Sequence, residues 1–465
     1  MIQASNPNGA RRNGRDDALR HDGMIATPPM ALERAQEIAS SFDLRALPAD
    51  FYGNPYPVYE SLRANEPIRR MPDGSWFLTR YDDLIAVYRD GRGFSSDKKV
   101  EFAPKYLHRP WQGDTAREDD APLFAHHTHS LVFNDPPLHT RVRKLIMVAL
   151  TRRAIREMEP GLVRLVDQLL DRIDDQGGGD LITDFASAIP VEVIGNLLGV
   201  PHADRTPLRG WSLAILGALE PALTPEQEAL GNRSVSEFLD YLKLLVADRR
   251  RCPGDPEHDV LTRLIQGEAG TPDDPVGGRL SEAELLHNCI FILNAGHETT
   301  TNLIGNALAT LQDWPGAKEE LQARIAVYRG DADLLAQHLD VAVDEFLRFE
   351  SSNQLGNRRA LVDCRIGGVD LPAGALLTLC IGAANRDPAQ FAHADRLDLM
   401  RHDNRHLAFG FGIHQCAGIS LARLEGRIAI GRFLQRFPHY RLTQPPVRGA
   451  RARFRGFLRA PFSVN

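Results

Sequence analysis

The stretch that decides the fold is AFGFGIHQCAGISLARLEGRIAIGRF, residues 408–433. Gly410 and Gly412 permit a positive φ and a close approach of the backbone to a flat group. Cys416 stands directly before a predicted helix that begins near Gly418. A helix N-terminus lowers the pKa of a thiol, and the thiolate binds metals or acts as a nucleophile. Taken alone, Cys416 is equally compatible with a buried and inert thiol.

Three simpler motifs fail in this stretch. A dinucleotide-binding G-x-G-x-x-G is broken because residue 415 is Gln. Gly418-Ile419-Ser420 does not form the G-x-S-x-G turn of a hydrolase. C-x-x-C-H is absent from the chain, which excludes covalent attachment of a c-type heme.

The whole stretch resembles the heme-binding signature F-G-x-G-x-H-x-C-x-G of the cytochrome P-450 superfamily. The matching residues are Phe409, Gly410, Gly412, His414, Cys416 and Gly418. The resemblance implies a heme b cofactor (iron protoporphyrin IX), bound at Phe409, His414 and Gly418. It also implies that the Cys416 thiolate is the metal ligand, axial to the heme iron, where it favours cleavage of the O–O bond.

A second family motif lies about 70 residues before the cysteine. DEFLRFE supplies Glu345 and Arg348 of an E-x-x-R pair. Residues i and i+3 share one helical face, so an ordinary surface ion pair is the alternative. In the family this pair is buried and braces an irregular segment behind the heme. The segments 385–391 and 406–410 resemble that irregular part.

Basic residues from distant segments resemble the family's contacts to the heme propionates. His139 and Arg143 match an H-x-x-x-R pair on one helical face, although an exposed basic face has the same pattern. NRRALVD resembles R-x-A-x-x-D and nominates Arg358, and His414 is the fourth candidate. Several cations suit two carboxylates in a partly buried pocket.

The segment NAGHETTTN, residues 294–302, first suggests a zinc protease helix. His297-Glu298 begins H-E-x-x-H, but Thr301 stands where the second histidine should be, so a hydrolase or protease loses its support. Residues 295–300 instead match the oxygen-activation motif of the P-450 superfamily, A-G-x-[D/E]-T-[T/S].

That match implies a role for each polar side chain beside the heme. Ala295 and Gly296 border the cofactor, and the missing side chain of Gly296 leaves room for dioxygen and substrate. Thr299 can turn its hydroxyl away from the local backbone toward the activated oxygen, and Glu298 can relay protons from solvent. His297 is expected to point outward. Thr300 and Thr301 are expected to bond back to carbonyls one turn earlier.

The best-defined element is a helix predicted over residues 281–314. Ser281 and Glu284 form a capping box, and Pro315 ends the helix. Its length of about 50 Å indicates a central position. Short strands are predicted around an Asp73-Gly74 turn and over 358–384, a last helix over 417–436, and a long irregular loop over 95–133.

We therefore predict a mainly α protein with a small β portion. Residues 31–465 form a single cytochrome P-450 domain with the long central helix over the heme, and residues 1–30 form a disordered tail. The charge of −6 excludes a strongly basic nucleic-acid binder. Five cysteines without C-x-x-C fit a reducing cytoplasm, and no apolar run is long enough for a membrane span.

One departure from the family concerns the substrate side. Ser352 stands where the family usually has Pro, and residues 353–355 are expected to form a strand edge facing the substrate. Asn353 and Gln354 there indicate hydrogen bonding to the substrate or an altered loop. Specificity is otherwise expected in 95–133, 204–235 and 353–356.

The resemblance implies a monomeric, cytoplasmic heme-thiolate monooxygenase that hydroxylates a small hydrophobic substrate, such as a terpenoid or another secondary metabolite. O2 would be reduced with electrons from a separate ferredoxin and ferredoxin reductase. A peroxide-driven peroxygenase and a heme gas sensor are the alternatives. The docking patch for an acidic ferredoxin is predicted from six basic residues, namely Arg401, His402, Arg405, His406, Arg423 and Arg427.

Overall fold

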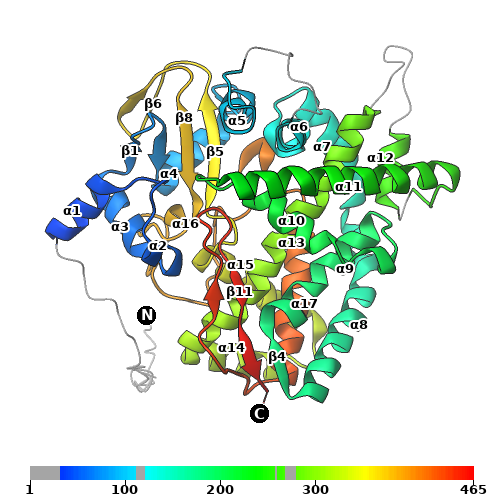
Figure 1. Cartoon of the computed structure of the whole chain (residues 1–465). Helices are drawn as coiled ribbons and strands as arrows, with labels where there is room; N and C mark the ends of the chain where they lie inside the picture. Colours follow the sequence, from blue (N-terminus) through cyan, green and yellow to red (C-terminus); the bar gives the residue numbers. More distant parts are fainter. Residues whose placement is uncertain (1–31, 112–120, 257–258, 268–278, 465) are drawn as a thin grey trace, which may run out of the picture.

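The computed structural model describes residues 32–111, 121–256, 259–267 and 279–464 (Figure 1). The tail predicted over residues 1–30 lies outside this part of the chain. The described residues combine a large helical body with a smaller region of sheet, as the sequence predicts.

The helical body surrounds α13 (Glu282–Asp313), which runs through the middle of the molecule (Figure 1). The helices around it contact α13 from several sides. They are α6 (Pro122–His129), α9 (Ala188–Leu197), α10 (Leu208–Gly217), α11 (Pro225–Arg251), α12 (Val260–Gln266), α14 (Pro315–Val327), α15 (Ala332–Phe349) and α17 (Ile419–Arg436). Two further helices of the body are α7 (Leu138–Ala149) and α8 (Arg152–Gln176).

The ends of α13 confirm the predicted capping box. The Glu284 amide donates to Ser281 Oγ at 3.2 Å, and the Ser281 amide donates to Glu284 Oε2 at 2.8 Å. The helix ends at Asp313, and Pro315 opens α14. Most side chains between Leu285 and Leu311 are buried, so this helix crosses the core.

The larger sheet has the strand order β1-β2-β8-β5-β3 and lies beside the N-terminal helices (Figure 1). β1 and β2 pair antiparallel with Ile68 opposite Leu78, around a turn in which Gly74 has φ 83°. The strands are β1 (Ile68–Arg70), β2 (Trp76–Leu78), β3 (Phe94–Ser95), β5 (Leu355–Ala360) and β8 (Leu376–Cys380). The helices of this region are α1 (Leu32–Ser41), α2 (Ala49–Gly53), α3 (Tyr56–Asn65), α4 (Tyr81–Arg89) and α16 (Ile381–Ala384).

Three smaller sheets complete the strands of the described chain. β6 (Cys364–Ile366) and β7 (Val369–Leu371) form a hairpin, and β10 (Val447–Arg448) pairs with β11 (Phe457–Arg459). β12 (Pro461–Ser463) lies between β4 (Gly178–Asp180) and β9 (Arg441–Leu442). The chain between β10 and β11 carries three arginines and returns to the middle of the molecule (Figure 1).

The prediction of one irregular loop over 95–133 is wrong for most of its described residues. They form α5 (Lys99–Tyr106), α6 and a short 3-10 turn at Leu131–Phe133. Phe102, Tyr106 and Leu123 on these helices are almost fully buried. Their burial against the core stabilises these helices, although the local sequence, with its many His and Pro residues, does not predict them.

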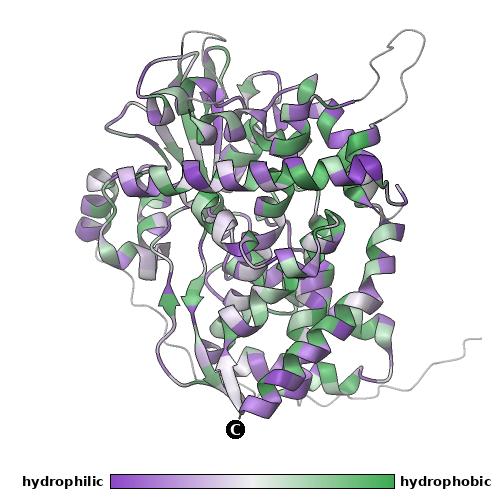
Figure 2. Cartoon of the chain, turned by 45° about the vertical axis from the view of Figure 1, so that its right-hand side comes forward, coloured by the Kyte–Doolittle hydropathy of each residue, from purple (hydrophilic) through white to green (hydrophobic). Residues whose placement is uncertain are grey.

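The core is continuous through the helical body, and the sheet has its own apolar clusters. Figure 2 shows hydrophilic and hydrophobic residues interspersed along the helices. Among the described helices, none combines the length and the apolar character needed to cross a bilayer.

Candidate functional site

The loop before Cys416 has the tight backbone that its glycines predict. Gly410 has φ 64° and Gly412 has φ 74°. The Cys416 amide donates to the carbonyl of Phe409 at 2.9 Å, which closes the loop. A Cβ on Gly412 would lie 2.3 Å from the carbonyl oxygen of Tyr88, so this glycine lets the loop approach α4. The positive φ values are confirmed, and the close neighbour of Gly412 is a backbone carbonyl.

Cys416 lies just before α17, and its side chain is exposed to solvent. Protein nonetheless surrounds the sulfur closely enough for burial to raise the pKa of the thiol. The Gly418 amide and the Arg143 guanidinium act in the opposite direction. The expectation of a lowered thiol pKa is therefore wrong for the protein alone, because desolvation outweighs the helix terminus.

Four basic side chains from three distant segments gather near this cysteine. We call them the donor set, and they are His139 and Arg143 of α7, Arg358 of β5, and His414 of the cysteine loop. The rings of His139 and His414 lie 4.1 Å apart. Burial, together with the nearby Arg358, His139 and Arg143, lowers the pKa of His414 to about 2. The structure thus brings together all four predicted residues.

The donor set has almost no acceptors among the described residues. Both ring nitrogens of His139 and Nε2 of His414 are buried without a hydrogen-bond partner. Arg358 donates only to the neighbouring carbonyl of Asn357, at 2.7 Å. Buried donors of this kind need an acceptor. A group with two carboxylates, as heme carries in its propionates, fits this set.

The central helix presents one accessible stripe in an otherwise buried stretch. Ala295 is exposed and Thr299, one turn later, is half-buried, whereas Asn294, His297 and Glu298 are buried. Solvent can reach the middle of a core helix only through an opening in the interior. The stripe therefore marks a space beside α13.

Gly296 allows close helix packing, which differs from its predicted role. A Cβ at this position would lie 2.6 Å from Cδ1 of Ile194 on α9. The glycine therefore lets α9 pack closely against α13. The space it leaves is filled by Ile194, and the prediction that it makes room for dioxygen is wrong on this point.

Of the three consecutive threonines, Thr299 is the one that bonds to its own helix. Its hydroxyl donates to the carbonyl of Ala295 at 2.7 Å, while Thr301 Oγ1 is buried without a partner. Back-bonding was expected at residues 300 and 301, so the expectation for Thr301 is wrong. The Thr299 bond is local, and a rotation about one side-chain torsion releases it.

His297 is fully buried, which contradicts the prediction that it points outward. Neither ring nitrogen has a partner among the described residues. Burial lowers the pKa of this imidazole to about 3, and Arg209 contributes in the same direction. A helix that is buried on nearly all sides gives no amphipathic signal for the orientation of one residue.

Glu298 is buried and paired with an arginine that the sequence analysis missed. Arg451 Nη1 lies 3.3 Å from Glu298 Oε1, and Asn302 Nδ2 donates to the same oxygen at 3.3 Å. Burial raises the pKa of Glu298, whereas Arg451 and Asn302 lower it. Arg451 Nη2 also donates to the carbonyl of Leu213 on α10, at 3.0 Å.

Arg451 belongs to the C-terminal arginine segment, residues 448–455. Arg448 lies 3.4 Å from Glu350, and Arg455 pairs with the same carboxylate. The alternating arginines of VRGARARFRG were the available signal. The sequence does not say which carboxylates they meet.

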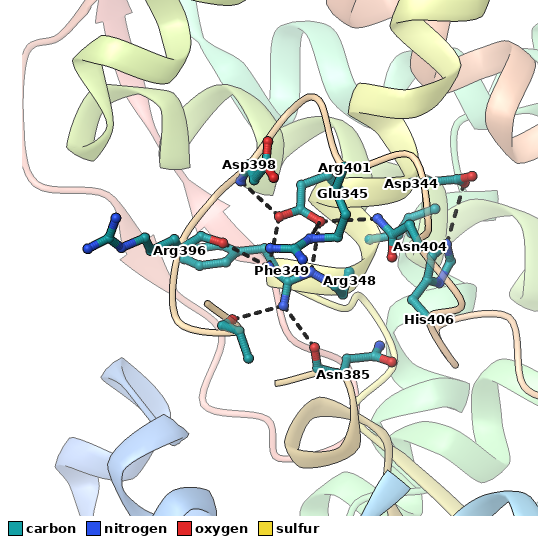
Figure 3. A network of polar contacts seen from close by, with 12 residues as sticks. Asp344, Glu345, Arg348, Phe349, Asn385, Arg396, Asp398, Arg401, Asn404 and His406 are labelled. Atoms are coloured by element: carbon teal, nitrogen blue, oxygen red, sulfur yellow. Dashed lines mark hydrogen bonds and ion pairs between the residues drawn. The ribbon is translucent and has the colours of Figure 1, made fainter. Parts of the chain in front are cut away.

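Glu345 and Arg348 form the buried pair that the sequence predicts (Figure 3). Both side chains are 0% exposed, and Arg348 Nε lies 2.7 Å from Glu345 Oε2. Arg348 donates to the carbonyls of Asn385, Ala394 and Arg396, at 2.8–2.9 Å. Glu345 accepts from the Asp398 amide, Arg401 and Asn404. The pair therefore holds the irregular chain of 385–404, and this prediction is confirmed.

The polar residues at the missing proline are not a free strand edge. β5 begins at Leu355, and Gln354 is 1% exposed. The side-chain Nε2 of Gln354 donates to the carbonyl of Ser351 at 2.7 Å. The backbone amide of Gln354 donates to the carbonyl of Arg453 at 2.8 Å. Gln354 is therefore engaged inside the protein, and the expectation that it faces the substrate is wrong.

Most residues of the predicted basic docking patch are paired with acids. Arg423 donates to both carboxylate oxygens of Asp344, at 2.8 and 2.9 Å. Arg427 meets Asp340 and Glu159, at 3.4 and 3.3 Å. Arg401 pairs with Glu345 and Arg405 with Asp403, and His406 Nε2 lies 3.4 Å from Asp344 Oδ1. These carboxylates neutralise much of the predicted positive field.

Comparison with known proteins supports the family resemblance found in the sequence motifs. Residues 218–459 match the family described as Cytochrome P450. The chain is 35% identical to Cytochrome P450 107B1 of Saccharopolyspora erythraea over 409 residues, which cover 87% of this chain and 93% of that protein. It is 36% identical to Vitamin D(3) 25-hydroxylase of Pseudonocardia autotrophica over 397 residues, 84% of this chain and 89% of that protein.

The fold is similar to solved structures as well. P450BioI, in a complex with an acyl carrier protein that bears hexadec-9Z-enoic acid, superposes with a TM-score of 0.78 at 31% identity. The match covers 89% of this chain and 100% of that chain. By motif, fold and sequence identity, the chain belongs to the cytochrome P450 family of monooxygenases, whose cofactor is heme b.

Proposed function

We propose that this protein inserts one oxygen atom of O2 into a small and largely apolar organic substrate, with Cys416 as the axial ligand of the heme iron. The observation that carries the proposal is the donor set beside an accessible cysteine: several buried donors lack acceptors. Such an arrangement is costly unless an anionic group binds there. His139, Arg143, Arg358 and His414 would hold the two propionates, and Phe409, Gly418 and Ala295 would border the ring.

Bound heme supplies the oxidising chemistry, and the thiolate ligand favours cleavage of the O–O bond. The residues of the chain leave room for the substrate beside α13 and supply the protons that the reaction needs. Ala295, a small side chain on the accessible stripe of α13, leaves room beside the helix. Thr299 can release its bond to the Ala295 carbonyl and donate its hydroxyl hydrogen into that space.

Glu298 is the proposed source of the protons that reach the space beside α13. Its raised pKa favours retention of a proton, and Arg451 opposes this by stabilising the carboxylate. Between these two influences the carboxyl can lose and regain a proton, as a general acid requires. Arg451 is less buried than Glu298, so water can reach the pair from the arginine side.

The named relatives support an apolar substrate without identifying it. One is named for vitamin D(3), and one solved structure holds an acyl chain on a carrier protein. Terpenoids and other secondary metabolites belong to the same apolar class. A ferredoxin and its reductase are the proposed electron donors, and we place this protein with monomeric cytoplasmic enzymes.

Carbon monoxide binding to the reduced protein tests the central assignment. We expect the long-wavelength Soret band of thiolate-ligated heme, and we expect Cys416→His to retain heme but lose that band. Cys252→Ser is the control, because this cysteine is exposed at the C-terminal end of α11. A Cys416→Ala protein that kept the band would refute the assignment.

A further inference from the structure

Two cations, Lys105 of α5 and Arg453 of the C-terminal arginine segment, lie in a partly buried region without an acid partner. We call them the cation pair. Lys105 Nζ donates to the backbone carbonyl of Glu220 at 2.7 Å. Arg453 donates to the carbonyls of Leu219 and Leu355 and to Asn357 Oδ1, at 3.2, 2.7 and 2.5 Å. Every acceptor is neutral, and in the described part of the chain neither cation forms an ion pair.

The two cations are close enough to influence one another. Burial and, second, repulsion from Arg453 lower the pKa of Lys105 to about 8. Partly buried cations are usually paired with carboxylates. A repelling pair bonded to neutral groups therefore indicates a place where an anion can bind.

Two acidic and three basic side chains in this region leave a surplus of one positive charge, namely Glu101, Glu220, Lys98, Lys105 and Arg453. Lys98 is paired with Glu101 at 2.5 Å, so these two cancel. Glu220 is the remaining carboxylate that interacts with both members of the cation pair. Its oxygens already accept the Ala452 and Arg453 amides, at 2.7 and 3.2 Å. Two cations against one carboxylate leave a charge that matches a monoanion.

A third polar group belongs to the same region. His127 of α6 is 1% exposed, and its Nε2 has no partner among the described residues. Its ring lies 5.6 Å from the ring of Tyr106, the neighbour of Lys105. Burial keeps the imidazole neutral, and Lys105 is the largest electrostatic influence on its pKa. A neutral imidazole can donate to or accept from a ligand.

The cation pair borders the donor set. Arg453 bonds to Asn357, and the next residue along β5 is Arg358. Both guanidinium groups act electrostatically on Tyr88 and Lys98. An anion at the cation pair would therefore lie beside the proposed heme site, on the side of α5 and α6.

We propose that Lys105 and Arg453 receive the carboxylate of an amphipathic substrate whose apolar chain extends toward the accessible stripe of α13. This rests on the proposed function and narrows its substrate class to apolar molecules with one carboxylate. A phosphate monoester, with about two charges near neutral pH, exceeds the surplus of one. The propionates are accounted for by the donor set.

Calorimetric titration of the heme-loaded protein tests the proposal without electrons or O2. The probes are saturated fatty acids from octanoic to hexadecanoic acid, each compared with the alcohol of the same chain length. We expect at least one acid to bind about tenfold more tightly than its alcohol, the size of a charge-assisted hydrogen bond. Acids that never bind more tightly than their alcohols would overturn the proposal.

Two variants and a control locate the effect. Lys105→Met and Arg453→Gln should each weaken acid binding about tenfold and leave alcohol binding unchanged, while Arg453→Lys should recover part of the loss. Arg365→Gln removes an exposed cation of β6 and should change neither. If Arg453→Gln fails to fold, Lys105→Met decides, because its ammonium makes a single hydrogen bond.

Equal effects of Lys105→Met on the acid and on the alcohol would contradict a carboxylate contact. The proposed reaction is tested separately, by product formation. A protein that binds the acid through the cation pair but forms no oxidised product would refute the reaction and leave the carboxylate site standing.

Discussion

Glu298 and Arg451 are separated by 153 residues, yet their side chains meet at 3.3 Å beside the central helix. The same arginine donates to the carbonyl of Leu213. One guanidinium thus joins the acid of α13 to α10. Because Glu298 is buried, the pairing decides how readily its carboxyl ionises.

Replacing Arg451 with Gln should raise the pKa of Glu298 further, because the opposing positive charge is lost. The ionised carboxylate would then be buried without its ion-pair partner, so the loss of stability should grow as pH rises and shrink where Glu298 is protonated. Urea unfolding at about pH 5 and about pH 8 measures this difference. Arg459→Gln is the control, since this arginine is 60% exposed. A pH-independent loss would show that Arg451 acts only through packing.

Breaking the buried Glu345–Arg348 pair should strongly lower the stability of the protein. Arg348→Ala would leave the Glu345 carboxylate fully buried and would free three backbone carbonyls. A loss of about 3–5 kcal/mol in the free energy of unfolding is expected. Denaturant unfolding followed by fluorescence gives the value. Arg365→Ala breaks an exposed ion pair and should cost less than about 1 kcal/mol; similar values for both variants would contradict the bracing role.

The close contact between α13 and α9 makes Gly296 sensitive to any side chain. Gly296→Ala should destabilise the protein by about 1–3 kcal/mol, because the new methyl would meet Ile194 at 2.6 Å. Combining it with Ile194→Ala should recover part of this loss in a double-mutant cycle. Strictly additive losses would show that the two positions do not interact.

Removing the Thr299 hydroxyl should uncouple electron use from product formation. In Thr299→Ala the fold should be unchanged, since the lost bond is local to α13. Product per reducing equivalent should fall, and hydrogen peroxide should account for the missing electrons. Thr299→Ser retains a hydroxyl and serves as the control. Unchanged coupling in Thr299→Ala would mean that another group delivers the proton.

The ion pairs of the proposed docking face make Asp344 the informative position. Asp344→Asn would release Arg423 and His406 from their shared acid. If an acidic ferredoxin docks there, reduction should become faster at low salt, and the gain should disappear at high salt. Stopped-flow reduction measures the rate, with Asp370→Asn on the exposed surface of β7 as the control. A rate that Asp344→Asn leaves unchanged at low salt would place the docking surface elsewhere.

Local sequence patterns predicted the elements that depend on neighbours in the chain. The capping box of α13, the turn at Asp73-Gly74 and the cysteine loop all follow from a few consecutive residues. The Glu345–Arg348 pair was also predictable, because both residues lie on one helix. Such features need no knowledge of the tertiary structure.

The errors concern contacts between distant segments. Arg451 could not be assigned to Glu298 from the sequence, and the burial of His297 depends on how α13 is surrounded. Gly296 was interpreted from its motif, while Ile194 on another helix determines its packing. The helices of 99–129 depend on apolar burial rather than on a strong local signal. Tertiary packing decided each of these features.

The C-terminal arginine segment also limits how this chain can change in evolution. Arg451 forms an ion pair with Glu298, and Arg448 and Arg455 both pair with Glu350. Losing Arg451 alone leaves the buried Glu298 carboxylate without its charged partner, whereas losing Arg451 and Glu298 together leaves no such charge. Relatives that lack the arginine should therefore lack its acid as well. These positions should covary across the family, although loops are ordinarily where substitutions accumulate one at a time.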